Sequence, residues 1–397
     1  MLNIIEHCSV CNTLVKTKFK LKFQDLPGAN EENYTQNVGI CENCGYIFTQ
    51  NPFSSEQLEN RYKKMSKFEY DSKEYVLTNE FKKQSLRQYH FLTENLDFNN
   101  INSIIEIGAA SGYNLSLYTD ICENVKGIEP SEENCRLAKQ NYNVDMFNGM
   151  FNEYLASNPQ TRYDIVFLSM VLEHIVDPAN FIHSCKKLCN KYMFIEIPTL
   201  DLRHDEEPMG IFAEEHVSLF TLDSLYELMR RAGFKLLNVE TIYGLRRYLP
   251  AGYPAIATIW ELTNEPQKPY KFNLFSSSEL LDKYISSSNS ELEKIRNKID
   301  QIPNDMKVAV WGIGHHASML LANTSLKSKN IVRVYDSDIR KHGITFAGVE
   351  ITSFKKEDVK TGVVDGILLT TYTAQNAIEN YLKKTGVDCK IYTLYNI

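Results

Sequence analysis

The sequence of 397 residues predicts an α/β protein with a doubly wound parallel sheet, a small cysteine module before it and a second, smaller sheet domain after it. Three observations support this prediction. Two Cys-x-x-Cys pairs stand near the start, strand-like apolar runs alternate with amphipathic helical patterns from residue 103 onward, and the alternation restarts after a polar stretch. Such alternation is typical of parallel sheets with helices on both faces.

The first module is expected to span residues 1–70 and to bind zinc. Its four candidate ligands are Cys8, Cys11, Cys41 and Cys44. Each Cys-x-x-Cys turn directs two thiolates toward one ion, and two such turns complete a tetrahedral site. Four protein ligands leave no open position, so this zinc ion would be structural. The five remaining cysteines are scattered and indicate no disulfide framework.

The main domain is expected to span residues 71–266. Residues 55–96 have a mostly helical pattern, and "TLDSLYELMRRAG" predicts a later helix that ends at Gly233. Short strand-like runs lie between helical patterns, and they occupy residues 103–108, 125–130, 163–169 and 191–198. Because these runs are almost continuously apolar, we expect strands buried on both faces.

The polar residues 267–302 predict a linker that enters a solvated helix, and residues 303–397 predict a second βαβ domain. This domain has its own glycine turn, with Gly312 and Gly314 after a strand and Asp336 at the end of the next strand. The pattern is similar to an NAD fingerprint. An NAD-dependent oxidoreductase therefore stays open as an alternative, as does a non-enzymatic scaffold.

The first strand of the main domain ends in the turn Glu106-x-Gly108-x-x-x-Gly112. Gly108 permits close approach of the backbone to a ligand, and the start of the following helix offers N–H groups. Glu129 closes the next strand, 21 residues after Gly108, where a carboxylate accepts hydrogen bonds from ribose hydroxyls. Together these features favour an adenosine-type ligand.

This order of motifs, continued by "YDIVFLSMVLEHIVDP", resembles the class I S-adenosylmethionine-dependent methyltransferases. With the four-cysteine module in front, "EEHVSLFT" and the trailing half-Rossmann domain, nearly the whole chain resembles the sugar C-methyltransferase family. The resemblance implies methylation of nucleotide-linked deoxyketosugars. It also implies that S-adenosylmethionine is held by a set of residues that comprises Glu106, Gly108, Gly112, Glu129 and Met170.

The acid/base candidates are His216, Glu215 and His174. Methylation of a carbon needs a base that removes the proton next to a ketone, and an imidazole titrates near neutrality. Ala213 and Glu214 stand where the family pattern has tyrosine and histidine, so methylation of carbon, oxygen or nitrogen stays open.

An anionic substrate such as a pyrophosphate could contact Tyr243, Arg246 and Arg247; the alternative is a basic surface loop. The net charge of −7 argues against a nucleic-acid partner. We see no secretion signal and no apolar run of the ~18 residues that span a bilayer. We therefore expect a cytoplasmic enzyme, monomeric or weakly homo-oligomeric, whose partner is a small molecule.

Overall fold

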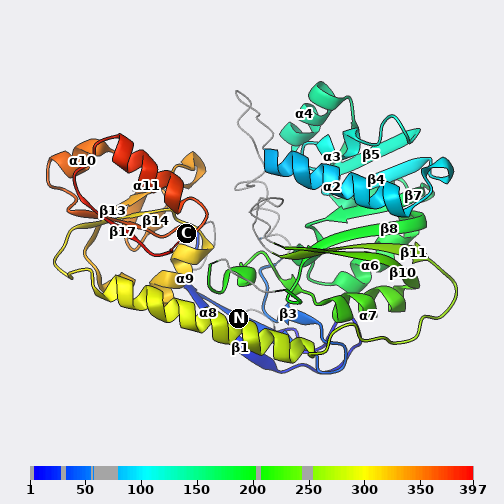
Figure 1. The fold of residues 1–397 in the computed structure, drawn as a ribbon, viewed down its shortest axis with the longest axis horizontal. Coiled ribbons are helices and arrows are strands. Elements are labelled where there is room, and N and C mark those ends of the chain that lie inside the picture. The colour runs from blue at the N-terminus through cyan, green and yellow to red at the C-terminus, as the bar shows by residue number, and fades with distance from the viewer. Residues whose placement is uncertain are drawn as a thin grey trace.

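The computed structural model describes residues 4–27, 33–54, 57, 79–202, 207–243 and 254–396. The chain forms two lobes that are joined along one side (Figure 1). One lobe contains the seven-stranded sheet of the main domain, and the other contains the C-terminal sheet. The long helix α8 (Ser277–Asp300) and the N-terminal strands connect the two lobes.

The main sheet has the strand order β10-β11-β8-β7-β4-β5-β6. Its strands are β4 (Ser103–Ile107), β5 (Asn124–Glu129), β6 (Asp145–Asn148), β7 (Tyr163–Ser169), β8 (Cys189–Pro198), β10 (Phe234–Ile242) and β11 (Ala255–Leu262). Strand β11 runs antiparallel to β8 and β10, whereas β4 to β8 pair in parallel. The predicted doubly wound sheet is therefore confirmed, with one antiparallel strand in addition.

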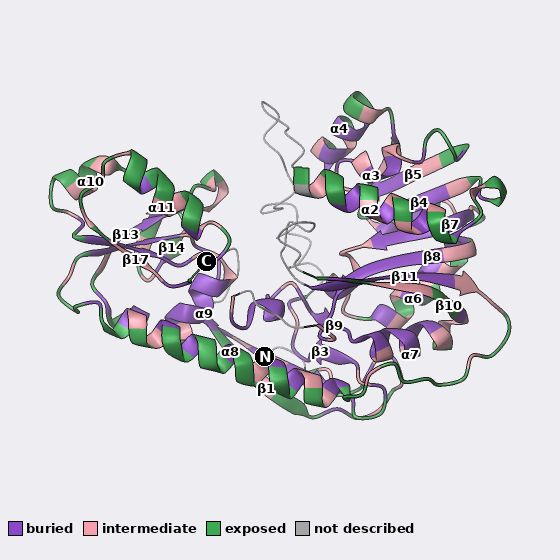
Figure 2. Ribbon diagram, viewed as in Figure 1, coloured by how far each residue is buried: buried purple, intermediate pink, exposed green. Residues whose placement is uncertain are grey.

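Helices cover both faces of this sheet. They are α2 (Asn79–Asn95), α3 (Tyr113–Ser116), α4 (Glu132–Tyr142), α5 (Phe151–Ser157), α6 (Pro178–Leu188) and α7 (Leu222–Ala232). Helices α2, α3 and α4 lie on one side, and α6 and α7 lie on the other (Figure 1). Figure 2 shows the central strands as buried, and the four residues from 165 to 168 in β7 have no exposed surface. Cover on both faces explains the continuous apolar runs of the sequence.

The N-terminal residues form a four-stranded sheet with the order β1-β2-β3-β9. Its strands are β1 (Thr17–Gln24), β2 (Asn33–Ile40), β3 (Ile47–Thr49) and β9 (Ser218–Leu219). Strand β9 comes from the main domain and pairs with β3, so that Leu219 lies opposite Ile47. The cysteine-bearing segment is thus joined by backbone hydrogen bonds to the segment that follows His216.

The C-terminal sheet has the order β14-β15-β13-β12-β16-β17 and is parallel except for β14. Its elements are β12 (Val308–Trp311), α9 (His315–Asn323), β13 (Ile331–Tyr335), β14 (Thr345–Phe346), β15 (Val349–Thr352), α10 (Lys356–Lys360), β16 (Gly366–Leu369), α11 (Gln375–Lys384) and β17 (Lys390–Thr393). This is the second Rossmann-like sheet that the sequence predicts.

The prediction of a solvated helix within residues 267–302 is wrong in one respect. Helix α8 buries Leu281, Leu292 and Ile299 along one face, while its other face is exposed. These side chains belong to a single hydrophobic core that also includes Leu21 of the N-terminal sheet and Val310 of the C-terminal sheet. The serines and charged residues of α8 occupy its exposed face. Because they are numerous, the sequence reads as polar, although its apolar residues recur along one side of the helix. None of the helices that the structure describes is long and apolar enough to cross a bilayer.

Candidate active site

The first glycine turn links β4 to α3 and has a backbone that other residues could not adopt without strain. Gly108 and Gly112 have φ angles of +76° and +75°, in the left-handed region. A Cβ atom on Gly108 would lie 2.9 Å from Cγ2 of Val171, and one on Gly112 would lie 2.8 Å from Cβ of Ala138. Both conformation and space therefore require glycine here. The helix that follows, α3, has four residues.

Glu129, at the end of β5, lies beside this turn. Its Oε2 accepts a hydrogen bond from the N–H of Ala110 at 3.0 Å, and its Oε1 accepts one from the N–H of Ser131 at 2.9 Å. These bonds fix the carboxylate against the turn, and a carboxylate oxygen can accept more than one hydrogen bond. The arrangement fits the ribose of an adenosine-type cofactor.

Glu106 is buried in β4 behind the same turn. Its Oε1 accepts a hydrogen bond from Nδ2 of Asn114 at 3.2 Å, whereas its Oε2 accepts none from the residues that the structure describes. Burial raises the pKa of Glu106 to about 8, and the hydrogen bond from Asn114 opposes the rise. An incompletely hydrogen-bonded carboxyl group at a glycine turn fits the cationic methionine end of S-adenosylmethionine.

Met170 directly follows β7 and has a φ of +53°, in the left-handed region. Its N–H donates to the carbonyl oxygen of Glu196 in the neighbouring strand β8 at 2.9 Å. Strand β7 therefore ends abruptly at the edge of the sheet where parallel α/β folds bind ligands. A short helical turn, η2 (Leu172–His174), comes next and brings a histidine to this edge.

The structure places His174 and His216 together, although 41 residues separate them in the sequence. Their ring centroids lie 5.1 Å apart at an interplanar angle of 68°. Nδ1 of His174 lies 3.0 Å from the backbone oxygen of Glu215, and this carbonyl can only accept the hydrogen bond. His216 is buried and His174 is partly exposed, so one ring remains accessible.

The position of His216 depends on the N-terminal sheet. The N–H of Thr49 donates to the carbonyl oxygen of Val217 at 2.8 Å, directly after His216. The hydroxyl of Ser218 donates to the carbonyl oxygen of Ile175, and the hydroxyls of Ser218 and Tyr46 lie 2.5 Å apart. These contacts tie η2, β9 and the cysteine-bearing segment into one rigid unit around the two histidines.

Glu173 is a residue of this site that the sequence does not single out. It is almost fully buried, and its Oε1 lies 3.9 Å from Nε2 of His174. Desolvation raises its pKa to about 7, while neighbouring His174 lowers it. In the sequence, only its position beside His174 in "LEH" points to a role in the site. A carboxylate in an apolar run is equally typical of a solvated turn, so this position alone does not identify it.

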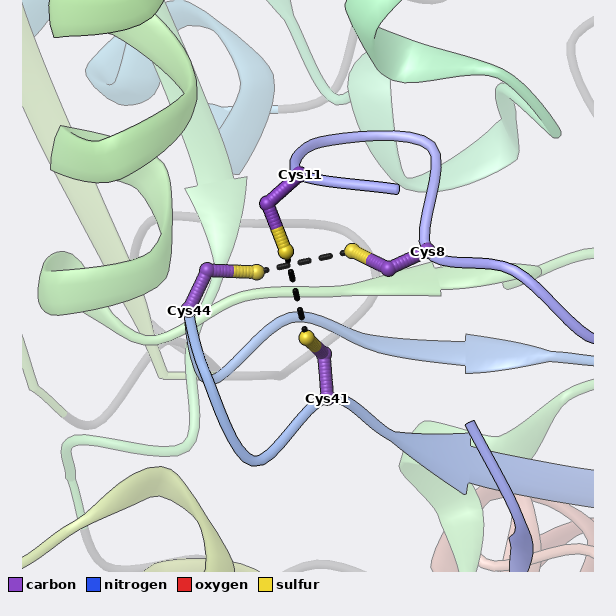
Figure 3. Close-up of side chains that lie close together, drawn as sticks. All are labelled: Cys8, Cys11, Cys41 and Cys44. Atoms are coloured by element: carbon purple, nitrogen blue, oxygen red, sulfur yellow. Dashed lines mark hydrogen bonds between the residues drawn. The ribbon is translucent and has the colours of Figure 1, made fainter. Parts of the chain in front are cut away.

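The four cysteines of the predicted zinc site converge on one point (Figure 3). The sulfur atoms of Cys8 and Cys44 lie 3.5 Å apart, those of Cys11 and Cys41 lie 3.4 Å apart, and all four lie within 4.8 Å of one another. Four sulfurs bonded to zinc at about 2.3 Å would have comparable separations. The donor set and spacing thus fit a tetrahedral Zn²⁺ ion.

The predicted substrate residues are described only in part. Tyr243 follows β10 and is exposed, which leaves its hydroxyl accessible to a ligand. Arg246 and Arg247 lie outside the residues that the structure describes.

The second glycine turn is engaged in contacts within the chain. Oδ2 of Asp336 accepts a hydrogen bond from the N–H of Ile313 at 2.7 Å and lies 3.0 Å from the ammonium group of Lys341. Nε2 of His315 lies 3.0 Å from a carboxylate oxygen of Glu207, in the segment that leads to His216. Burial lowers the pKa of the adjacent His316 to about 4. These contacts favour a structural role for the turn over NAD binding.

Two models of known protein families match separate parts of the chain. Residues 77–239 match the model of a methyltransferase domain, and residues 304–391 match a model described as C2185-like, N-terminal. The residues matched by the methyltransferase model contain the parallel strands β4 to β8 and most of β10 of the main sheet.

Curated relatives match part of this chain. The ubiquinone biosynthesis O-methyltransferase of Rhodopseudomonas palustris (strain TIE-1) is 28% identical over 119 residues, which are 29% of this chain and 46% of the relative. The enzyme of the same name from Hydrogenovibrio crunogenus is 27% identical over 124 residues, or 29% and 49% of the two chains. The chain thus spans about half the length of the curated relatives it matches.

Among solved structures, a SAM-dependent methyltransferase from Archaeoglobus fulgidus is 18% identical. The match covers 46% of this chain and 94% of that one, with a TM-score of 0.36. The [4+2]-cyclase SpnF is 14% identical over 45% of this chain and 80% of its own, with a TM-score of 0.35.

Proposed function

We propose that this protein is an S-adenosylmethionine-dependent methyltransferase that acts on a nucleotide-linked sugar, with His216 handling the proton of the acceptor. One observation carries the proposal: the glycine turn and the histidine pair are adjacent. Gly108 packs against Val171, and Val171 directly precedes the helical turn that bears His174. A cofactor held by the turn and an acceptor held by the histidines would therefore meet at the same edge of the sheet.

The residues of the turn suit S-adenosylmethionine. Glu129 would hold the ribose hydroxyls, Gly108 and Gly112 would let the backbone approach the ligand, and the Glu106 carboxyl group would face the methionine end. Met170, in its left-handed conformation, would flank the adenine. When bound, the cofactor supplies a methyl group on a sulfonium centre, which is already activated for displacement. The protein then needs only to align the acceptor and to remove its proton.

His216 would accept this proton, and Glu215 would support it. The imidazole has a suitable intrinsic pKa, and the backbone contacts of Val217 and Ser218 hold its position. His174 is oriented by the carbonyl of Glu215, which leaves its Nε2 on the side of Glu173. It would position the acceptor rather than deprotonate it.

The proposal of a nucleotide-sugar acceptor is supported by the order of the modules in the sequence and by the contact between the two lobes. Glu207, which pairs with His315, lies only nine residues before His216. Ile211, in the same segment, donates its N–H to the hydroxyl of Tyr284 in α8. The C-terminal domain would thus lie beside the approach to His216 and would enclose a long substrate. Tyr243, Arg246 and Arg247 would contact its pyrophosphate.

Methylation of oxygen is the second candidate. Ala213 occupies the position where the family pattern has tyrosine, and it is fully buried, so it offers no hydroxyl to a ketosugar. The curated relatives are named O-methyltransferases. A sugar hydroxyl needs only alignment and a base, both of which the histidine pair could supply.

The four cysteines would bind a structural zinc ion. Its role would be to hold the N-terminal sheet in the conformation that receives β9, and so to fix His216. Because all four positions are taken by thiolates, this ion would not contact the substrate.

Product analysis tests the proposed function directly. The full chain is incubated with S-adenosylmethionine and a panel of nucleotide-sugars, and products are weighed by mass spectrometry. A gain of one methyl group on a nucleotide-sugar supports the proposal, and its absence on every nucleotide-sugar contradicts the substrate class.

Solvent deuterium exchange then separates the two chemistries. Exchange next to the sugar ketone without cofactor is expected only for C-methylation, and it should be lost in His216→Asn. The matched control His183→Asn changes an exposed histidine of α6 and should keep full exchange and activity. Full activity in His216→Asn would exclude this residue as the base.

A further inference from the structure

Glu173, His174 and His216 form a cluster whose ligand atoms all lie within 4.8 Å of one another. Two of the residues come from η2 and the third precedes β9, so two separate segments create the cluster. Glu173 and His216 are buried, whereas His174 is partly exposed. The cluster is thus largely buried and reaches the surface through His174.

The hydrogen bonding of His174 defines what this cluster can hold. Its Nδ1 must donate to the carbonyl of Glu215, because a carbonyl oxygen has no proton to give. In the neutral imidazole, Nε2 then carries a lone pair, and this atom lies 3.9 Å from Oε1 of Glu173. A distance of 3.9 Å is too long for a hydrogen bond, so no proton bridges the two atoms.

The carboxylate of Glu173 also indicates a bound cation. Its Oε2 accepts no hydrogen bond from any residue in the described part of the chain, although the residue is only 2% exposed. A buried carboxylate in this state is costly unless a cation compensates it. Two donor atoms 3.9 Å apart fit the same metal ion, since bonds to imidazole nitrogen and carboxylate oxygen are each about 2.0–2.2 Å long.

We propose that Glu173, His174 and His216 bind a divalent transition-metal ion, through one carboxylate oxygen and two imidazole nitrogens. This donor set suits Mn²⁺, Fe²⁺, Co²⁺ or Zn²⁺. Three protein ligands leave open positions, unlike the four-cysteine cluster. The bond from His174 to the carbonyl of Glu215 is the outer contact that commonly orients a metal-bound imidazole.

The role of this ion rests on the proposed function, whereas its binding does not. An acceptor hydroxyl on the ion would have a lowered pKa and would lose its proton to water. The oxygen lone pair then forms the bond to the methyl carbon, and the carbon–sulfur bond breaks with its electron pair going to sulfur. With the ion bound, the metal would take up the lone pair of His216, so His216 would act on the acceptor proton through the ion and would accept that proton directly only without it. The sulfonium becomes a neutral thioether.

Manganese binding tests the site without any substrate. The full chain, loaded with one zinc ion per chain so that only the four-cysteine cluster is filled, is titrated with Mn²⁺, and the free Mn²⁺ is followed by electron paramagnetic resonance. Mn²⁺ prefers oxygen and imidazole ligands and leaves thiolate sites to zinc, so wild type is expected to bind about one Mn²⁺ per chain. Glu173→Gln and His216→Asn should each weaken binding by at least about 10-fold. His183→Asn is the matched control and should bind as wild type does.

Binding of S-adenosylhomocysteine to the same samples shows that the variants are folded and separates the two proposals. If no Mn²⁺ binds, or if both site variants bind it like wild type, the metal proposal is overturned even where S-adenosylhomocysteine binds. If Mn²⁺ binds as expected and S-adenosylhomocysteine does not, the metal site stands and the proposed function fails.

Discussion

The two glycine turns of this chain begin from similar sequence patterns and reach different structures. In the first turn, Gly108 and Gly112 both have left-handed φ angles, and neither has room for a Cβ atom. In the second, Gly312 is constrained in the same way, but Gly314 has an extended φ of −146° and nothing within 4 Å of its Cβ position. Only the first turn needs every glycine that its pattern contains.

The acidic residues beside the two turns also differ in the groups that hold their carboxylates. Glu129 accepts hydrogen bonds from two backbone N–H groups, whereas Asp336 forms an ion pair with Lys341. Two residues before the first glycine, the first strand has the buried Glu106, and the second has the buried Val310. A βα turn can thus serve a ligand or the fold itself, and the contacts of its acidic residue distinguish the two cases.

Among these tests, removal of zinc should have the largest effect. It should lower the hydrogen-exchange protection of the second turn but not that of the first. Structural zinc contributes on the order of 10 kcal/mol to small domains, so Cys44→Ser should loosen the N-terminal sheet. The helix that follows the second turn contacts the end of that sheet, because the hydroxyl of Ser318 in α9 donates to the carbonyl oxygen of Asp25, directly after β1. In hydrogen-exchange mass spectrometry, residues 213–221 and 312–320 should lose protection, while residues 104–116 should keep it.

The control for this experiment is Cys389→Ser, which changes a half-buried cysteine outside the cluster. Its exchange pattern should match wild type. Equal loss of protection in both turns of Cys44→Ser would contradict the asymmetry.

Substitution of the turn glycines should have the next largest effect. Gly112→Ala forces a side chain into a left-handed conformation and toward Cβ of Ala138, at a cost of about 1–3 kcal/mol in the free energy of unfolding. Affinity for S-adenosylhomocysteine should fall by at least about 10-fold, because the turn shifts. The matched change Gly314→Ala should alter the free energy of unfolding by less than about 0.5 kcal/mol. Similar losses in both variants, by urea denaturation and calorimetry, would remove the distinction.

The acidic residues give a third test. Glu129→Ala removes a charged acceptor of ribose hydroxyls, each such hydrogen bond being worth about 1.5–3 kcal/mol, so affinity for S-adenosylhomocysteine should fall about 10- to 100-fold. Asp336→Ala should leave this affinity unchanged. Calorimetric titration of both variants measures the difference, and an unchanged affinity in Glu129→Ala would place the ribose elsewhere.

The smallest effect concerns pH. Burial raises the pKa of Glu106 to about 8, so the folded chain keeps a proton that the unfolded chain releases near its ordinary value. The folded state then binds more protons between these two pKa values, and this residue lowers stability as pH rises through that range. Glu106→Gln lacks the titration. Its free energy of unfolding, relative to wild type, should therefore be higher at pH 8.5 than at pH 5.5.

Urea denaturation at the two pH values measures the change, which should be on the order of 1 kcal/mol or more. Parallel pH dependence of the two proteins would mean that Glu106 is not neutral in the fold.

Much of the architecture could be predicted from the sequence because it depends on local patterns. Apolar periodicity gave the parallel strands, the positions of Gly108 and Gly112 indicated the turn, and two Cys-x-x-Cys pairs indicated the cluster that Figure 3 shows. These features depend on residues that are close in sequence or on spacing alone.

The candidate site could be predicted only in part, because it depends on contacts between distant segments. His174 and His216 were singled out separately, but their contact requires β9 to leave the main sheet and pair with β3. Glu173 becomes a candidate site residue only through the orientation of His174, which its hydrogen bond to the carbonyl oxygen of Glu215 sets. The contact between Glu207 and His315 joins two lobes. No pattern within a single segment carries information about these pairings.

The most direct test of the central claim is a pair of calorimetric titrations on the full chain, one with S-adenosylhomocysteine and one with NADH. The account predicts about one S-adenosylhomocysteine per chain with a Kd in the micromolar range, weakened in Glu129→Ala, and no heat with NADH. Binding of NADH that is lost in Asp336→Ala, with no binding of S-adenosylhomocysteine, would contradict the account.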